Sequence, residues 1–344
     1  MPNENSNTPE LWTRRRMLRT LFCSSAALAL NVHGRLIARA ADLLAEPDDL
    51  HWLMLGDYGS RKPAQSRVAA GLRDYVGRLQ LHPEGLLLLG DNFYGPMPGG
   101  LQSPRWREGF EDIYPPALFP GPCPAVLGNH DYHDQPGGEQ DQLAYARHPG
   151  TRWTLPHKWY RRDYPEKAPL VTFLFLDTNL RPVSGGRSKK TGLPQPCLTA
   201  AEEAAQWAWL DAEFARPRAP WTICVGHHPI YNNGRHGDQP ALIAELAPRL
   251  ERHAVPLYLC GHDHDLQHLE LEGLATSFVI SGGGGADLYE VVPSARGRFV
   301  QSVFGFSHLQ INPRRLLLRH LDESGRQLHA FTKPLGARAV APLL

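Results

Sequence analysis

Five short hydrophobic runs along the chain each end at a glycine that is followed by polar residues. They read HWLMLGDYG at 51–59, GLLLLGDNFY at 85–94, PAVLGNHD at 124–131, WTICVGHHP at 221–229 and PLYLCGHDH at 256–264. Short apolar runs that are closed by Gly are typical of buried strands leading into loops. We therefore predict five strands with polar loops at their carboxyl ends, which is where open α/β sheets build their sites.

Helical patterns lie between these runs. Apolar side chains recur at helical spacing over 64–80, so 51–90 is predicted to be a strand–helix–strand unit with parallel strands. Thr199 and Glu202 form a capping-box pattern that predicts the start of a further helix. Residues 239–254 also show a helical pattern, which we expect to be interrupted at Pro248.

The pattern changes after about residue 265. Alternating strands and turns are expected over 276–285, 306–313, 314–322 and 326–333, with a turn at 323–325. We predict that these segments form an antiparallel set. The four glycines that end the first segment are expected to make a tight turn near the site.

Three segments look irregular. Residues 95–109 and 132–158 are rich in Gly, Pro, His and aromatic residues, and long loops of this kind usually form the rim of a site. Residues 181–196 are basic and bounded by Gly and Pro. We expect that segment to be an exposed surface insertion, open to proteases.

Residues 1–40 are predicted to be an export signal rather than part of the fold. An arginine cluster at 13–19 has the twin-arginine pattern, and it precedes a modest apolar stretch and an A-x-A-like cleavage site before Ala41. We therefore expect a periplasmic or secreted protein that engages export machinery. The catalytic domain would be residues 41–344.

Composition narrows the classes of partner. The 344 residues are 42% hydrophobic and 21% charged, which is typical of a soluble globular chain. No apolar run approaches the roughly 20 residues that span a membrane. Residues 1–40 contain six arginines and two glutamates, so the remainder is slightly acidic and no basic field indicates a nucleic-acid partner.

The cysteines outside the predicted signal fall into two pairs. Cys224 and Cys260 lie within predicted strands and are expected to be buried small hydrophobic residues. Cys123 and Cys197 lie in predicted loops. They either stay free or form a disulfide in an oxidising compartment.

The five motifs, taken in order, read G-D-x-G, G-D-x-x-Y, G-N-H-D, G-H-x-P and G-H-x-H. In this order they resemble the calcineurin-like metallophosphoesterase superfamily, and most closely the purple acid phosphatases of the small, tartrate-resistant animal type. The resemblance extends over about residues 50–333 and includes GHHPIY and CGHDHDLQHLE. It implies a four-layer α/β/β/α sandwich, in which two mixed sheets pack face to face with helices on the outer faces.

The resemblance also implies two metal ions. The first metal would be held by Asp57, Tyr94 and His264, and the second by Asn129, His227 and His262. Asp91 would bridge the two metals. Carboxylate and phenolate oxygens suit Fe(III), whereas imidazole and amide oxygen suit a divalent Fe, Zn or Mn.

Tyr94 points to the purple acid phosphatases in particular. Other members of the superfamily carry a His two residues after the first Asp, and this chain has Gly59 there. A Tyr three residues past Asp91 would supply the ligand instead. A trivalent metal would deprotonate its phenol.

The implied reaction is hydrolysis of a small phosphate monoester, with a metal-bound hydroxide as nucleophile. The resemblance offers His130 and His236 as donors of a proton to the leaving oxygen, and a mildly acidic medium would favour their charged forms. Asp131 and Asp263 are expected to orient the imidazoles that bind metal. Two alternatives stay open, a phosphodiesterase or nucleotide-cleaving enzyme on the same scaffold and a metal-binding or redox protein that does not hydrolyse.

Overall fold

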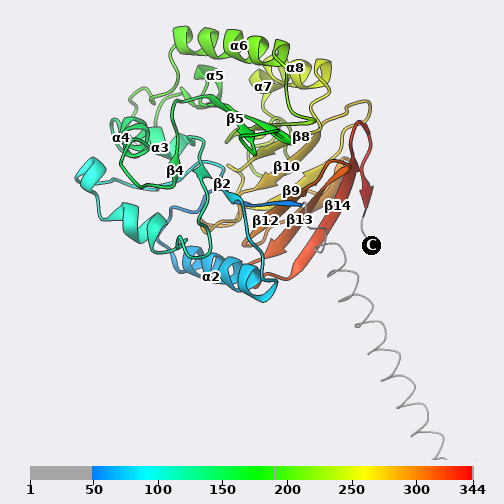
Figure 1. Ribbon diagram of the computed structural model, residues 1–344. Coiled ribbons are helices and arrows are strands. Elements are labelled where there is room, and N and C mark those ends of the chain that lie inside the picture. The colour runs from blue at the N-terminus through cyan, green and yellow to red at the C-terminus, as the bar shows by residue number, and fades with distance from the viewer. Residues whose placement is uncertain (1–48, 190, 343–344) are drawn as a thin grey trace, which may run out of the picture. The chain divides into compact units, whose positions relative to one another are not determined.

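The computed structural model describes residues 49–189 and 191–342, so the expected export signal at 1–40 lies outside the described residues. From Leu50 onward the chain forms one compact unit. Its two larger sheets face each other, and helices lie against their outer faces (Figure 1). This arrangement confirms the predicted four-layer sandwich.

The first sheet has the order β15-β14-β13-β12-β1-β2. Its strand β1 runs parallel to β2 and antiparallel to β12, so the sheet is mixed. The strand bounds in chain order are β1 (Leu50–Leu55), β2 (Gly85–Leu88), β12 (Gly305–Ile311), β13 (Arg315–Asp322), β14 (Gln327–Pro334) and β15 (Ala341–Pro342).

The second sheet has the order β11-β9-β10-β8-β7-β6-β5. Its bounds are β5 (Tyr160–Tyr164), β6 (Val171–Phe175), β7 (Trp221–Val225), β8 (Leu257–Cys260), β9 (Leu266–Leu269), β10 (Ser277–Ser281) and β11 (Gly297–Gln301). The adjacent strands β6, β7, β8 and β10 are parallel. The prediction of an antiparallel set after residue 265 is therefore confirmed for β12 to β14 but only partly right for β10, which lies parallel to β8 and antiparallel to β9.

Four of the five hydrophobic runs form the predicted strands, and the run at 124–128 does so only at its start. There β3 (Cys123–Pro124) pairs with β4 (Trp153–Thr154), and a single bridge joins Ala125 to Leu88. Proline has no N–H to donate, so Pro124 limits the ladder that this segment can form. Beyond the bridge, the segment continues toward the site as a loop.

The long helices match their sequence patterns. Helix α2 (Pro63–Arg78) covers the first sheet near β12, and α6 (Ala200–Ala215) lies against the second (Figure 1). The Thr199 hydroxyl accepts from the Glu202 N–H at 3.2 Å and the Glu202 carboxylate accepts from the Thr199 N–H at 2.8 Å, so the capping box is confirmed. Helices α7 (Pro240–Glu245) and α8 (Ala247–Arg252) meet just before Pro248, where the interruption was expected.

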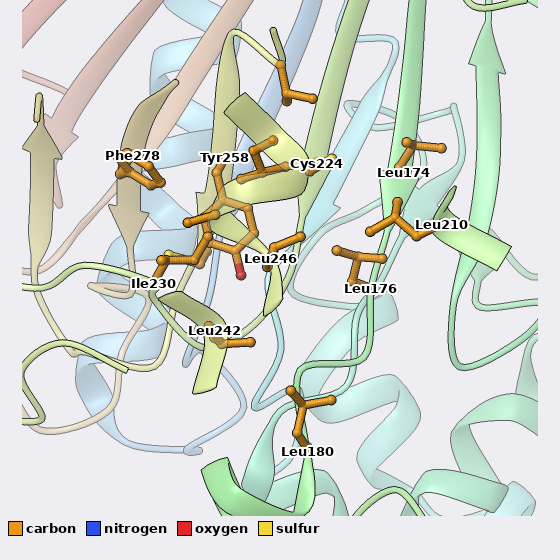
Figure 2. Close-up of a cluster of buried hydrophobic side chains, with 14 of the residues drawn as sticks. Leu174, Leu176, Leu180, Leu210, Cys224, Ile230, Leu242, Leu246, Tyr258 and Phe278 are labelled. Carbon is orange, nitrogen blue, oxygen red and sulfur yellow. The ribbon is translucent and has the colours of Figure 1, made fainter. Parts of the chain in front are cut away.

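The core of the outer layer joins these helices to the second sheet. Apolar side chains of α6, α7 and α8 pack on side chains of β6, β7, β8 and β10, as Figure 2 shows for part of the cluster. Between the sheets, the rings of Trp52 and Phe173 meet edge to face at 5.3 Å. Burial on both faces explains why the strand runs are continuously apolar rather than alternating.

The long loops are more ordered than the sequence predicts. Residues 95–109 and 132–158 contain η1 (Gly100–Gln102), part of a π-helical turn η2 (Arg107–Glu111), the C-terminal end of α3 (Asn129–His133), α4 (Gly138–Tyr145) and the strand β4. The two loops pack on each other, because the rings of Trp106 and Tyr145 stack at 3.6 Å. The basic segment 181–196 begins with α5 (Arg181–Ser184) and turns back through a bridge between Arg187 and Pro194.

The cysteines that the structure describes are all free, so no disulfide joins Cys123 to Cys197. Cys224 and Cys260 are buried as expected. Cys123 was predicted to lie in a loop, but it begins β3 and is fully buried. Over the described residues, no helix combines the length and the apolar character that a membrane span requires.

Candidate metal centre

The loops that follow β1, β2, β7 and β8 meet at one edge of the two sheets. The Asp57 N–H donates to the Gly90 carbonyl at 3.0 Å, which joins the first two loops. The Gly261 N–H donates to the His227 carbonyl at 3.0 Å, which joins the other two. The His262 N–H donates to Asp57 Oδ2 at 2.8 Å, which joins the two pairs of loops, so both sheets contribute to the crevice.

Asp57, Tyr94 and His264 form one half of the site. The Tyr94 hydroxyl lies 3.3 Å from Asp57 Oδ1 and 3.1 Å from His264 Nε2. Burial, together with the charges of Asp91 and Asp57, raises the pKa of the Tyr94 hydroxyl well above its usual value. A phenolate at this position therefore requires a highly charged cation beside it.

Asn129, His227 and His262 form the other half. The Nε2 atom of His227 lies 3.3 Å from Asn129 Oδ1 and 3.3 Å from His262 Nδ1. The three side chains come from the start of α3 and from the loops after β7 and β8. They converge although 133 sequence positions separate the first from the last.

Asp91 lies between the two halves. Its Oδ1 atom is 3.4 Å from His227 Nε2, and Asp57, Asp91 and His227 each offer a ligand atom within 4.8 Å of the others. Burial by itself would raise the pKa of the Asp91 carboxyl, but the facing His227 and His130 outweigh it and lower the value to about 2. An ionised carboxylate in this position is suited to bridge two cations.

Two of the imidazoles are held from behind. His227 donates from Nδ1 to the Leu89 carbonyl at 2.8 Å, and His264 donates from Nδ1 to the Asp287 carbonyl at 2.5 Å. These hydrogen bonds direct the Nε2 atom of each ring into the site. The arrangement is typical of histidines that bind metals, because the second ring nitrogen fixes the tautomer and the ring orientation.

Three of the residues have a left-handed backbone. The φ angles are 59° at Asp57, 49° at Asp91 and 70° at His262. Such angles are uncommon outside glycine, and they cluster where a surrounding structure holds a functional side chain in place. Three such residues lie together at this crevice although they are far apart in the sequence, which supports a functional role for it.

Gly59 lies against the segment that carries Tyr94. A Cβ atom at Gly59 would lie 1.9 Å from the Asn92 carbonyl oxygen, so no side chain fits there. The Gly59 carbonyl accepts from the Tyr94 N–H at 3.1 Å. The segment 92–94 therefore leaves no room for a side chain at Gly59 and is joined to Gly59 through the Tyr94 N–H.

The two predicted proton donors lie at the rim of the site. The His130 ring is 4.4 Å from the Tyr94 ring, and its Nδ1 atom is 2.9 Å from Asp134 Oδ2. Burial would lower the pKa of His130, but Asp91 and Asp134 more than offset it and raise the value to about 9. His236 lies 4.3 Å from the His262 ring, and its side chain is 36% exposed.

The expected roles of Asp131 and Asp263 were wrong. Among the described residues, Asp131 makes no hydrogen bond to an imidazole; it accepts backbone N–H groups from the loops that carry Asp91 and Asn129. Asp263 contacts His236 instead of a predicted ligand, with 3.1 Å between Oδ2 and Nδ1. The sequence showed that these carboxylates lie near the site, but not which way they point.

Two residues at the site had no role in the sequence analysis. The Tyr289 ring stacks on the His264 ring at 4.0 Å, although it follows the glycine run in an irregular segment with no motif. His228 is buried and its ring lies 4.4 Å from His262. Its Nδ1 atom lies 2.9 Å from the Thr178 hydroxyl, so it is accommodated within the scaffold.

The residues present fit a pair of metal ions. Carboxylate and phenol oxygens gather in one half, whereas imidazole nitrogens and an amide oxygen gather in the other. Burying two carboxylates beside one another is costly, and a cation between them relieves that cost. The donor set suits a hard ion beside a borderline divalent ion.

Comparison with known proteins agrees with this geometry. The model of the calcineurin-like phosphoesterase family matches residues 49–266. The tartrate-resistant acid phosphatase type 5 of Oryctolagus cuniculus is 30% identical, over 84% of this chain and 92% of its own. Purple acid phosphatase 7 of Arabidopsis thaliana is also 30% identical, over 81% of this chain and 84% of its own.

Among solved structures, the fold is similar to that of the Plasmodium protein GAP50, described as the anchor in the inner membrane complex. The TM-score is 0.70 at 21% identity, over 84% of this chain and 90% of the other. At this identity the likeness concerns the fold alone, and one fold can serve catalysis or anchoring. The family match spans residues 49–266 and includes all seven predicted metal ligands. The chain therefore belongs to the calcineurin-like phosphoesterase family.

Proposed function

We propose that this protein is an acid phosphatase that hydrolyses phosphate monoesters at a binuclear metal centre. The position of Asp91 between the two halves of the site carries the proposal, since a bridging carboxylate is what two adjacent cations need. Asp57, Tyr94 and His264 would hold one ion, and Asn129, His227 and His262 the other. The acid phosphatases among its relatives support this reading.

The metal identities follow from the donor chemistry. A phenol next to a buried carboxylate favours Fe(III), and the half with imidazoles and an amide oxygen favours a divalent Fe, Zn or Mn. When bound, such ions supply Lewis acidity and an activated water for attack on phosphorus. The residues of the chain orient the substrate and handle the protons.

His130 and His236 are the proposed proton donors to the leaving oxygen. Each lies at the rim, next to a predicted ligand, and each has a carboxylate on its Nδ1 atom, Asp134 for His130 and Asp263 for His236. A carboxylate in this position fixes the orientation of the ring. At His130, where burial alone would lower the pKa, Asp91 and Asp134 raise it to about 9. The proton would be donated from Nε2, the ring nitrogen that the carboxylate does not contact.

The preference for monoesters can be tested directly. We expect the metal-loaded protein to cleave p-nitrophenyl phosphate with a larger kcat/KM than bis(p-nitrophenyl) phosphate. A preference for the diester would instead support the alternative of a phosphodiesterase. Failure to cleave either ester, with both metals bound, would favour a protein that keeps the fold but does not hydrolyse.

We also propose that residues 1–40 direct export to the periplasm. The arginine cluster at 14–16 carries this part of the proposal. Replacing these arginines with lysines is expected to retain the protein inside the cell, whereas the unchanged chain is exported. Export of the lysine variant at the normal rate would contradict the twin-arginine route.

A further inference from the structure

An exposed arginine lies beside the candidate metal centre. Arg235 immediately precedes His236 in the loop after β7, and its guanidinium carbon lies 4.8 Å from the centre of the Tyr289 ring. Arginine stacks well on aromatic faces, so the ring holds the planar end of the side chain without using its N–H donors.

This guanidinium has no carboxylate partner among the residues that the structure describes. The neighbouring Arg296 differs, since it pairs with Asp238 at 2.6 Å. The nearby Asp287 is also engaged, by Lys62 at 2.5 Å. Arg235 therefore retains its positive charge and its donors for a group outside this part of the chain.

Tyr289 connects Arg235 to the metal site. The Tyr289 ring stacks on His264 at 4.0 Å with 15° between the planes. Arginine, tyrosine and histidine thus form successive layers from the rim to the predicted first metal. The His236 ring lies 5.4 Å from Tyr289, so the same aromatic side chain contacts both rim residues.

We propose that Arg235, supported by Tyr289, binds a second anionic group of the substrate, next to the phosphoryl group held at the metals. This inference rests on the proposed function. The chemistry recognised is an oxyanion with two accessible oxygens, in either a second phosphoryl group or a carboxylate. Both match the planar fork of a guanidinium, which can donate two parallel hydrogen bonds. Arg235 would thereby determine specificity and take no part in the chemical step.

The site would select esters by what surrounds the reacting phosphate. A phosphate monoester with no further charge would be held at the metals alone. An ester that carries another oxyanion close by would also engage Arg235. A charge-assisted hydrogen bond of this kind changes affinity by about tenfold to a hundredfold.

The test measures binding to the metal-loaded protein by calorimetry, without turnover. The probes are methylphosphonate, methylenediphosphonate and phosphonoacetate, which present one phosphonate, two phosphonates, and a phosphonate with a carboxylate. The metals themselves also attract a second anionic group. We therefore define the preference as the affinity for each two-group probe divided by the affinity for methylphosphonate, and we compare this ratio before and after Arg235 is replaced. We compare Arg235→Gln and Arg235→Lys with Arg298→Gln, a substitution of an exposed arginine on β11.

We expect Arg235→Gln to reduce the preference for at least one of the two probes that carry a second anionic group by about tenfold or more. Arg235→Lys should retain part of this preference, and Arg298→Gln should retain all of it. The probe that loses most identifies the second group as phosphoryl or carboxylate. Unchanged preferences for both probes in Arg235→Gln would overturn the proposal, even if the thermal midpoint fell, because that result would assign the stacked arginine to stability.

The outcome is independent of the proposed activity. Cleavage of p-nitrophenyl phosphate with no effect of Arg235 on binding would reject the anion site and leave the phosphatase intact. An effect of Arg235 on binding without any hydrolysis would support the anion site and reject the phosphatase activity.

Discussion

The backbone N–H of Asn92 donates to the carboxylate of Asp131, with 3.0 Å between the nitrogen and Oδ1. The same buried carboxylate accepts the N–H of Gly128 at 2.8 Å. Asn92 follows Asp91, and Gly128 precedes Asn129. One side chain therefore sets the spacing between the proposed bridging residue and a proposed ligand of the second metal.

Replacing Asp131 with Asn should disturb both fold and site. In Asp131 each carboxylate oxygen accepts backbone N–H groups, whereas the side-chain NH2 group of Asn would replace one of those oxygens with a donor. The backbone N–H that loses its acceptor is buried, and a buried donor without a partner costs about 1 to 3 kcal/mol. We expect a loss of that size in the free energy of unfolding in urea, together with less second metal per chain. Asp74→Asn, at an exposed position on α2, is the control. Equal stability and metal content in the two variants would contradict this role for Asp131.

The proposed iron–tyrosinate bond predicts colour. The iron-loaded protein should absorb visible light, and Tyr94→Phe should remove that band while far-ultraviolet circular dichroism stays unchanged. Tyr289→Phe is a close control, because Tyr289 also contacts His264 but through its ring face. A colourless active protein, or a band that survives Tyr94→Phe, would refute the assignment of Tyr94 to Fe(III).

Asp91→Asn tests the bridging carboxylate. The substitution keeps the shape and removes the charge that lies between the two halves of the site. We expect kcat to fall by at least about a hundredfold, since even the outer partners of metal ligands can cause losses of that order. Asp112→Asn, in a surface ion pair with Arg107, should behave like the unchanged protein. Turnover near normal in Asp91→Asn would show that the carboxylate does not bridge.

Much of the fold follows from local patterns. The strands β1, β2, β7 and β8 and the helices α2 and α6 were predicted because burial and capping leave strong signals in short windows of sequence. The segment after Pro124 was misassigned, since its apolar residues are buried without forming a regular ladder. The loops 95–109 and 132–158 were predicted as irregular because their order depends on a contact between them, the Trp106–Tyr145 stack.

The residues of the site could be predicted from the sequence where they lie within one of the five motifs. The residues proposed to bind metal lie at strand ends in recognisable order, and the structure brings them together. Tyr289 and Arg235 carry no such signal, because their positions depend on how two distant loops fold against each other. The direction of Asp131 was missed for a related reason, since three neighbouring backbone N–H groups compete for its carboxylate.

Buried and half-buried histidines join the two sheets. The Nδ1 atom of the buried His268 on β9 lies 2.9 Å from Nε2 of the half-buried His329 on β14, and His320 Nε2 on β13 lies 3.1 Å from the Gln267 carbonyl on β9. Burial lowers the pKa of His268, His320 and His308, and it lowers that of His329 to about 4. Glu270 opposes the shift at His268, whereas Lys333 adds to it. These rings are therefore neutral in the folded protein at neutral pH.

Acid should destabilise the fold through these histidines. Below about pH 6.5 the unfolded chain binds protons that the folded protein does not, so the free energy of unfolding falls as the pH falls. For His329 this loss continues to about pH 4, where the folded ring also becomes protonated. Urea unfolding at pH 7, 5.5 and 4.5 measures the slope. We expect His329→Gln to flatten it, because an amide can bond to His268 without titrating, whereas His148→Gln at an exposed position should not. A slope that is identical in the two variants would mean that the acid sensitivity arises elsewhere, for instance in the buried carboxylates.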